Sequence, residues 1–234
     1  MAIKIAHRAE ITPEFITGWK KNSLRKLNVI KSEFDGLPEY CRSSFMRNNG
    51  ATFAHLTKVA KGDIDLETTK LRSMPYDKFG FLEHNENEYL CGLTRPVLID
   101  EYRPGYGLKD KPVLIHKWDL GRYLIFMNVT ELSNPSYSAY AFWHFVPERN
   151  KLATERHMHH KAYPGEYKSP TDYLAFKSAT CWGGFGSIII SLMAGMDVVE
   201  LFRIISTYLN RYDPHSPLIR GGIDGITFKQ DVKQ

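Results

Sequence analysis

The chain has 234 residues, of which 43% are hydrophobic and 13% aromatic, so it can bury a sizeable core and is not disordered as a whole. Its net charge of +5 and its pI near 9.0 favour a polyanionic partner without identifying one. Its three cysteines are widely spaced, which argues against a disulfide framework or a CxxC metal site and favours a reducing, cytoplasmic environment.

The N-terminal region predicts a short strand followed by a long helix. Ile3 and Ile5 alternate with polar neighbours, as in a strand. Thr12 followed by Pro13 is typical of a helix N-cap with proline in the first turn. Apolar residues then recur at helical spacing until Gly36, where we expect the helix to end.

Two further helices are expected over residues 38–47 and 51–60. The following segment, 62–88, is acidic and weakly patterned, so we interpret it as an irregular connection or insertion. We treat the whole chain, 1–234, as a single domain that carries this acidic insertion.

The net charge of the chain is positive over residues 1–61 and negative over residues 62–101. Residues 1–61 contain 11 Lys/Arg and 5 Asp/Glu, whereas residues 62–101 contain 4 and 9. Pairing between the two segments explains this asymmetry as well as an external ligand does.

The apolar period then changes to two, which predicts an antiparallel meander. The expected strands are 90–93, 96–102, 113–118, 122–129 and 137–146, with a hairpin across 119–121. A histidine-rich loop over 147–168 and a short strand at 173–176 follow.

The C-terminal part predicts two helices. A glycine-rich segment opens the first at about residues 187–194, and Asp197 with Glu200 resembles a capping box that opens the second at 197–210. A last strand is expected at 226–229. The fold class is therefore α+β, with a central antiparallel sheet flanked by N-terminal and C-terminal helices.

The window 178–196 contains no charged residue, which raises the question of a membrane span. Its serine, threonine and glycine residues before the isoleucine run argue against a spanning helix, so we expect a soluble protein with no membrane partner. The pattern indicates no oligomeric state.

The glycine-rich segment is the most informative feature of the sequence. Gly183, Gly184, Gly186 and Ser187 lead into an apolar helix, whose first N–H groups and positive dipole end point at one spot. Such a place can hold a phosphate, a carboxylate or a thiolate. Close packing of the backbone is the alternative explanation.

Cys181 stands just before this turn, where a helix N-terminus lowers a thiol pKa. Cys181-Trp182 resembles the nucleophile region of papain-like and transglutaminase-like enzymes, in which a histidine generally follows the cysteine. Here only His215 follows it, so Cys181 is either a nucleophile in a permuted order or a buried structural thiol.

The run Arg156-His157-Met158-His159-His160 offers a second chemistry. His-Met-His matches the signature with which single-strand nicking nucleases bind a divalent metal. Adventitious or structural zinc and a solvated loop are the alternatives, and we assign no metal site.

Gly184-Phe185-Gly186 followed by Ser187 and an apolar helix resembles the acyl-CoA pyrophosphate loop of the GNAT acyltransferase superfamily. The N-terminal strand and helix start, followed by helices before an antiparallel meander, resemble the order of that family. Cys181 occupies the position of its Arg/Gln.

The resemblance implies an acyl-CoA-dependent N-acyltransferase, or a degenerate scaffold of that fold. Backbone amides at Gly183, Gly184, Gly186 and Ser187 would bind the cofactor without a metal. His144 or Glu148 would serve as base and Tyr173 as acid.

The alternative function is a non-enzymatic protein that binds nucleic acid or an assembly partner. The basic N-terminal helices would contact phosphates, and aromatic residues of the sheet would form a stacking platform if exposed. If those aromatics are buried, they belong to the core.

Overall fold

The computed structural model describes residues 8–103, 113–119, 122–130, 140–146, 151–153 and 182–210. Its helices are α1 (Pro13–Gly36), α2 (Glu39–Lys61), α3 (Thr68–Ser73), α6 (Gly186–Ala194) and α7 (Val198–Leu209), with a 3₁₀ turn, η2 (Gly183–Phe185), before α6. The strands are β1 (Tyr76–His84), β2 (Asn87–Thr94), β3 (Leu98–Arg103), β4 (Val113–Asp119), β5 (Arg122–Asn128), β6 (Tyr140–Val146) and β7 (Lys151–Ala153). The expected strands at the N-terminus, 173–176 and 226–229 lie outside the described residues.

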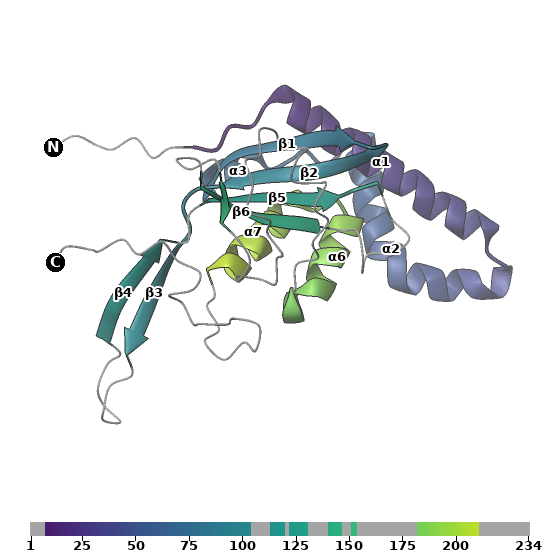
Figure 1. Cartoon of the computed structure of the whole chain (residues 1–234). Helices are drawn as coiled ribbons and strands as arrows, with labels where there is room; N and C mark the ends of the chain where they lie inside the picture. Colours follow the sequence, from purple (N-terminus) through teal and green to yellow (C-terminus); the bar gives the residue numbers. More distant parts are fainter. Residues whose placement is uncertain are drawn as a thin grey trace.

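The main sheet has five antiparallel strands in the order β1-β2-β5-β6-β7, and β3 and β4 form a separate two-stranded ribbon (Figure 1). The predicted hairpin between 113–118 and 122–129 is wrong, because β4 pairs with β3 while β5 pairs with β2. The ribbon is thus inserted between two neighbouring strands of the main sheet. Both its strands were expected, but the short loop before β5 suggested the wrong partner.

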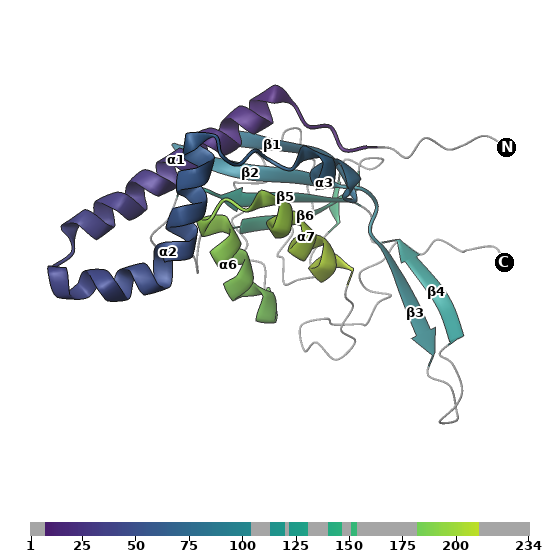
Figure 2. The ribbon, with the colours of Figure 1, turned by 180° about the vertical axis from the view of Figure 1, so that it is seen from behind.

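The helices cover one face of the main sheet, as the view from behind shows (Figure 2). Phe15 of α1 and Phe202 of α7 both pack against Phe79 of β1, with ring centroids 5.8 and 4.7 Å apart. The buried apolar residues of α1, α2, α7 and the sheet form one cluster. The α+β class, with helices from both ends of the chain on an antiparallel sheet, is confirmed.

The helix α1 begins as predicted, with Thr12 as its N-cap residue and Pro13 in its first turn. Thr12 caps the helix by accepting a hydrogen bond from the Phe15 backbone N–H, and Pro13 is its first residue. The helix ends at Gly36, as expected.

The two helices expected between residues 38 and 60 are one continuous helix, α2. Gly50 does not interrupt it, because a glycine costs a helix interior only about 1 kcal/mol and tertiary packing offsets that. Leu56 and Val59 supply this packing, since both are buried. Asn49 also stays within the helix by donating to the Phe45 carbonyl at 3.1 Å.

The acidic segment is not irregular, so that part of the interpretation is wrong, whereas its being an insertion stays a prediction. It contains α3 and the edge strand β1. Tyr76 and Leu71 are fully buried there, and Phe81 stacks on Phe15 at 5.5 Å. A register shift between Tyr76 and Lys78 breaks the period-two pattern, which explains why the strand was missed.

The buried face of α1 carries polar residues as well as aromatic ones. Asn22, Ser23 and Lys26 are each no more than 3% exposed. Ser23 donates to the Trp19 carbonyl at 2.8 Å, but the Asn22 side-chain oxygen has no hydrogen-bond partner in the part of the chain that the structure describes. Burial, together with a smaller contribution from the positive charge of neighbouring Arg25, lowers the pKa of Lys26 to about 7.

Candidate functional site

The predicted glycine-rich segment forms a compact turn that opens α6. Residues 183–185 make the 3₁₀ turn, in which the Phe185 N–H donates to the Trp182 carbonyl at 3.0 Å. Phe185 is also the N-cap residue of α6 and provides no side-chain cap. Gly184 and Ser187 are exposed. The first amides of α6 therefore lie at the surface beside the positive end of the helix dipole.

The glycines of this turn are not required by packing among the described residues. A Cβ added at Gly184 would meet none of their atoms within 4 Å, and one at Gly186 would lie 3.8 Å from the Trp182 Cβ, an ordinary contact. Neither residue has a positive φ, since Gly62 is the one described glycine that does. An L-residue could replace either one without strain in the described fold.

Aromatic contacts fix the position of the turn. The Trp182 ring lies 4.9 Å from the Tyr208 ring of α7, and the Phe185 ring lies 5.5 Å from it in an edge-to-face arrangement. Trp182 is 3% exposed. The turn is thus held on a buried base, while Gly184 is exposed and Gly186 is half-buried.

The proposed acid–base residues are only partly described. His144 lies in β6, where its backbone pairs with Tyr123 of β5 and Ala153 of β7. Glu148, Tyr173 and Cys181 lie outside the described residues. Their roles stay predictions.

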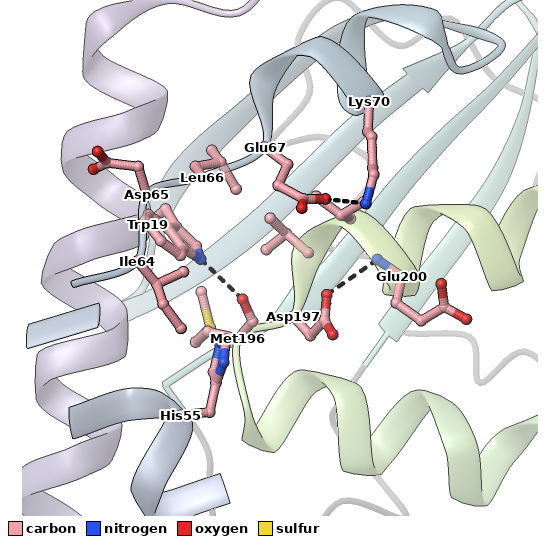
Figure 3. A pocket seen from close by; sticks show the side chains of 12 residues that line it. Trp19, His55, Ile64, Asp65, Leu66, Glu67, Lys70, Met196, Asp197 and Glu200 are labelled. Carbon is pink, nitrogen blue, oxygen red and sulfur yellow. Dashed lines mark hydrogen bonds and ion pairs between the residues drawn. The ribbon is translucent and has the colours of Figure 1, made fainter. Parts of the chain in front are cut away.

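A pocket of about 380 Å³ opens at the other end of α6, where the chain turns into α7 (Figure 3). Its walls come from α1, α2, the segment before and within α3, and the start of α7. The lining residues are Trp19, His55, Ile64, Asp65, Leu66, Glu67, Lys70, Met196, Asp197, Val198, Val199 and Glu200. The volume is within the usual range for a small-molecule site.

The backbone at the base of this pocket is held in an uncommon conformation. Met196 has φ 51°, a left-handed geometry that β-carbon sterics disfavour. Its carbonyl accepts the Trp19 indole N–H at 2.9 Å and the Val198 N–H at 2.9 Å. The first of these bonds ties α1 to the α6–α7 junction, and the second lies within the junction.

One part of the pocket wall is charged and consists of Lys70 and the carboxylates near it. Glu67 accepts from the Lys70 ammonium at 2.5 Å, and this hydrogen bond raises the lysine pKa, with further contributions from Asp197 and Glu200. Arg203 pairs with Glu200 and lowers the pKa of that carboxyl. Asp197 caps α7 by accepting from the Glu200 N–H at 3.2 Å, as the capping-box prediction required.

No sequence motif marks this pocket as a site. The prediction that Asp197 caps a helix is confirmed, but it does not indicate a pocket. His55 belongs to no motif identified in the sequence. The pocket exists because four separated segments meet, which local patterns do not encode.

Internal ion pairs account for part of the charge asymmetry. Basic residues of α1 face acidic residues of the segment that follows α2. The pairs are Lys20–Asp65 (3.0 Å), Lys21–Glu88 (3.3 Å) and Arg25–Glu88 (3.9 Å). In addition, Tyr123, one of the aromatics considered for a stacking platform, is 1% exposed and belongs to the core.

Within the described ranges, no three His, Cys, Asp or Glu residues are grouped as metal ligands, and residues 157–160 lie outside those ranges. None of the helices described has both the length and the apolar character needed to cross a bilayer.

The chain matches no protein-family model, no curated protein and no solved structure. Function is therefore argued from its own residues.

Proposed function

We propose that this chain is an acyl-CoA-binding domain of GNAT-like design, with the 183–187 turn as its pyrophosphate site. The observation that carries the proposal is the exposed turn itself: two glycines that the described fold does not require stand at the uncapped start of a helix. Glycine allows a ligand to approach the backbone closely, and the helix start favours an anion.

The binding chemistry would use main-chain groups. Amides near Gly184, Gly186 and Ser187 would donate to pyrophosphate oxygens, and the Ser187 hydroxyl could add one further donor. The cofactor supplies the activated acyl group when it is bound. The buried contacts of Trp182 and Phe185 would keep the amides in place, so that little ordering is needed on binding.

In this proposal His144 or Glu148 would accept the proton of an acceptor amine and Tyr173 would protonate the departing thiolate. A chain that binds acyl-CoA without transferring the acyl group would be a scaffold of the same fold. Acetyl transfer by wild type and by His144→Ala separates these two forms of the proposal.

A thermal-shift panel tests the binding step. The ligands are acetyl-CoA, CoA, zinc and a single-stranded oligonucleotide. At a hundredfold excess over Kd, a ligand stabilises the native state by about 2.7 kcal/mol. We expect acetyl-CoA and CoA to raise Tm, and Gly184→Gln to abolish the increase without lowering the Tm of the free protein.

Gly36→Gln is the matched control, because a Cβ at Gly36 also meets nothing within 4 Å among the described residues. It should keep the acetyl-CoA response. A chain that ignores both CoA compounds and is stabilised by the oligonucleotide in a salt-dependent manner would instead have the alternative, nucleic-acid-binding function.

A further inference from the structure

Two polar side chains in the wall of the pocket at the α6–α7 junction, His55 and Asp197, have hydrogen-bonding capacity that the described residues do not use. The His55 Nε2 atom is shielded from solvent and has no hydrogen-bond partner among the described residues. A buried nitrogen of this kind costs free energy unless it is paired, so its place in a pocket wall indicates a ligand group.

Asp197 supplies a second group. Its Oδ1 accepts the Glu200 N–H, and no described residue donates to its Oδ2. The other three carboxylates of the pocket already have basic partners. These pairs are Asp65–Lys20, Glu67–Lys70 and Glu200–Arg203. Asp197 is thus the one lining carboxylate that no described lysine or arginine side chain pairs within salt-bridge distance.

Figure 3 shows the His55 ring and the Asp197 carboxylate on either side of Met196. With its proton on Nδ1, His55 presents an acceptor at Nε2, and Asp197 presents an anionic acceptor. Two acceptors, one of them charged, fit an N–H donor that carries positive charge.

Part of the remaining lining is apolar, and the charged residues Asp65, Glu67, Lys70 and Glu200 complete it. Trp19, Leu66 and Val198 line the same pocket and are nearly or fully buried. An indole ring also favours a nearby cation. The walls therefore suit a ligand with a hydrocarbon or aromatic part beside its charge.

We propose that this pocket binds a small primary amine that carries an apolar group, with its ammonium between His55 Nε2 and the Asp197 carboxylate. The site is independent of the glycine turn. The two lie at opposite ends of α6, a helix of 9 residues and hence about 13 Å long.

Calorimetric titration with three probes of similar size tests the charge preference. The probes are 2-phenylethylamine, the neutral 2-phenylethanol and the anionic 3-phenylpropionate. We expect the amine to bind at least about tenfold more tightly than either of the others, as a charge-assisted hydrogen bond predicts. Equal binding of the three probes, or no binding of the amine, would overturn the proposal.

Two variants locate the site. Asp197→Asn keeps an N-cap acceptor for α7 but removes the charge, and His55→Leu removes the acceptor nitrogen. Each should weaken amine binding about tenfold, whereas Glu33→Gln, which removes an exposed charge on α1, should change it less than twofold. Amine binding that is unchanged in both pocket variants would contradict the assignment.

Circular dichroism of each variant checks that it is folded. If Asp197→Asn unfolds α7, backbone amide chemical shifts of the wild type on adding the amine decide the question. The proposal requires the shifts to centre on His55 and Asp197, and shifts elsewhere would reject it. Acetyl-CoA titration should be unaffected in both variants, so a failure here is distinguishable from a failure of the glycine-turn proposal.

Discussion

Two pairs of glycines in this chain have opposite environments. At the crossing of α1, the sheet and α7, a Cβ at Gly18 would lie 2.5 Å from Phe81 and one at Gly92 would lie 2.6 Å from Phe202. At the start of α6, Gly184 and Gly186 have room for a side chain. Packing in the described fold requires a glycine at each position of the first pair but not of the second, which is why we propose that a ligand contacts the second pair.

The largest expected effect concerns Lys26, the one buried lysine or arginine among the described residues. The folded-state pKa of Lys26 is about 7, below its ordinary value of 10.5, so folding disfavours the charged amine. The penalty is complete below pH 7 and is relieved as pH rises from 7 towards 10.5. Lys26→Met should therefore raise the free energy of unfolding by about 3–5 kcal/mol at pH 6.

Urea unfolding at pH 6 and pH 10 measures this effect. The gain from Lys26→Met should be several-fold smaller at pH 10, where the unfolded lysine also loses part of its charge. Lys31→Met, at an exposed position of the same helix, serves as the control. A gain that does not change with pH would mean that the amine is not desolvated.

The next largest effect is expected at Gly92, the glycine that packs against Phe202. Gly92→Val should lower the free energy of unfolding by about 3 kcal/mol, because Phe202 is fully buried and its ring is held by Tyr76 and Phe79. Gly80→Val is the control on the neighbouring strand, since a Cβ there meets nothing within 4 Å among the described residues. Equal urea midpoints for the two variants would show that the crossing is loosely packed.

A smaller effect is expected from the hydrogen bonds at the same crossing. The Tyr76 hydroxyl donates to the Phe202 carbonyl at 3.1 Å and accepts from Ser206 at 3.2 Å. Tyr76→Phe should cost about 1 kcal/mol in chemical denaturation. Tyr40→Phe, at a residue that is 86% exposed, should cost almost nothing. If Tyr76→Phe lowers the free energy of unfolding no more than Tyr40→Phe does, the Tyr76 hydroxyl bonds do not stabilise the fold.

The smallest effect is expected in the turn. Gly184→Val should change the free energy of unfolding by no more than about 0.5 kcal/mol, as at other unconstrained surface positions. A loss comparable to that of Gly92→Val in the same urea assay would show that the fold does require Gly184. The contrast between the two pairs of glycines would then disappear.

Local rules predicted the helix ends and the packing of α7. Thr12 and Asp197 cap helices as expected, and Val198, Leu201 and Ile205 are buried at helical spacing. These features depend on residues within a few positions of one another, so the sequence pattern contains them.

Strand pairing and the pocket could not be predicted in the same way. The partner of β4 depends on a ribbon inserted between β2 and β5, and β1 was hidden by a register shift. The pocket requires Trp19, His55 and Asp197 to meet across long separations in the chain. Such contacts are selected by tertiary packing, which short-range periodicity does not report.

The most direct test of the glycine-turn assignment is calorimetric titration of acetyl-CoA into wild type, Gly184→Gln and Gly184→Glu at matched stability. The account predicts measurable binding by wild type, weaker binding by the glutamine variant, which blocks the backbone, and the weakest by the glutamate variant, which also repels the pyrophosphate. Binding by all three with the same Kd, or binding by none, would contradict it.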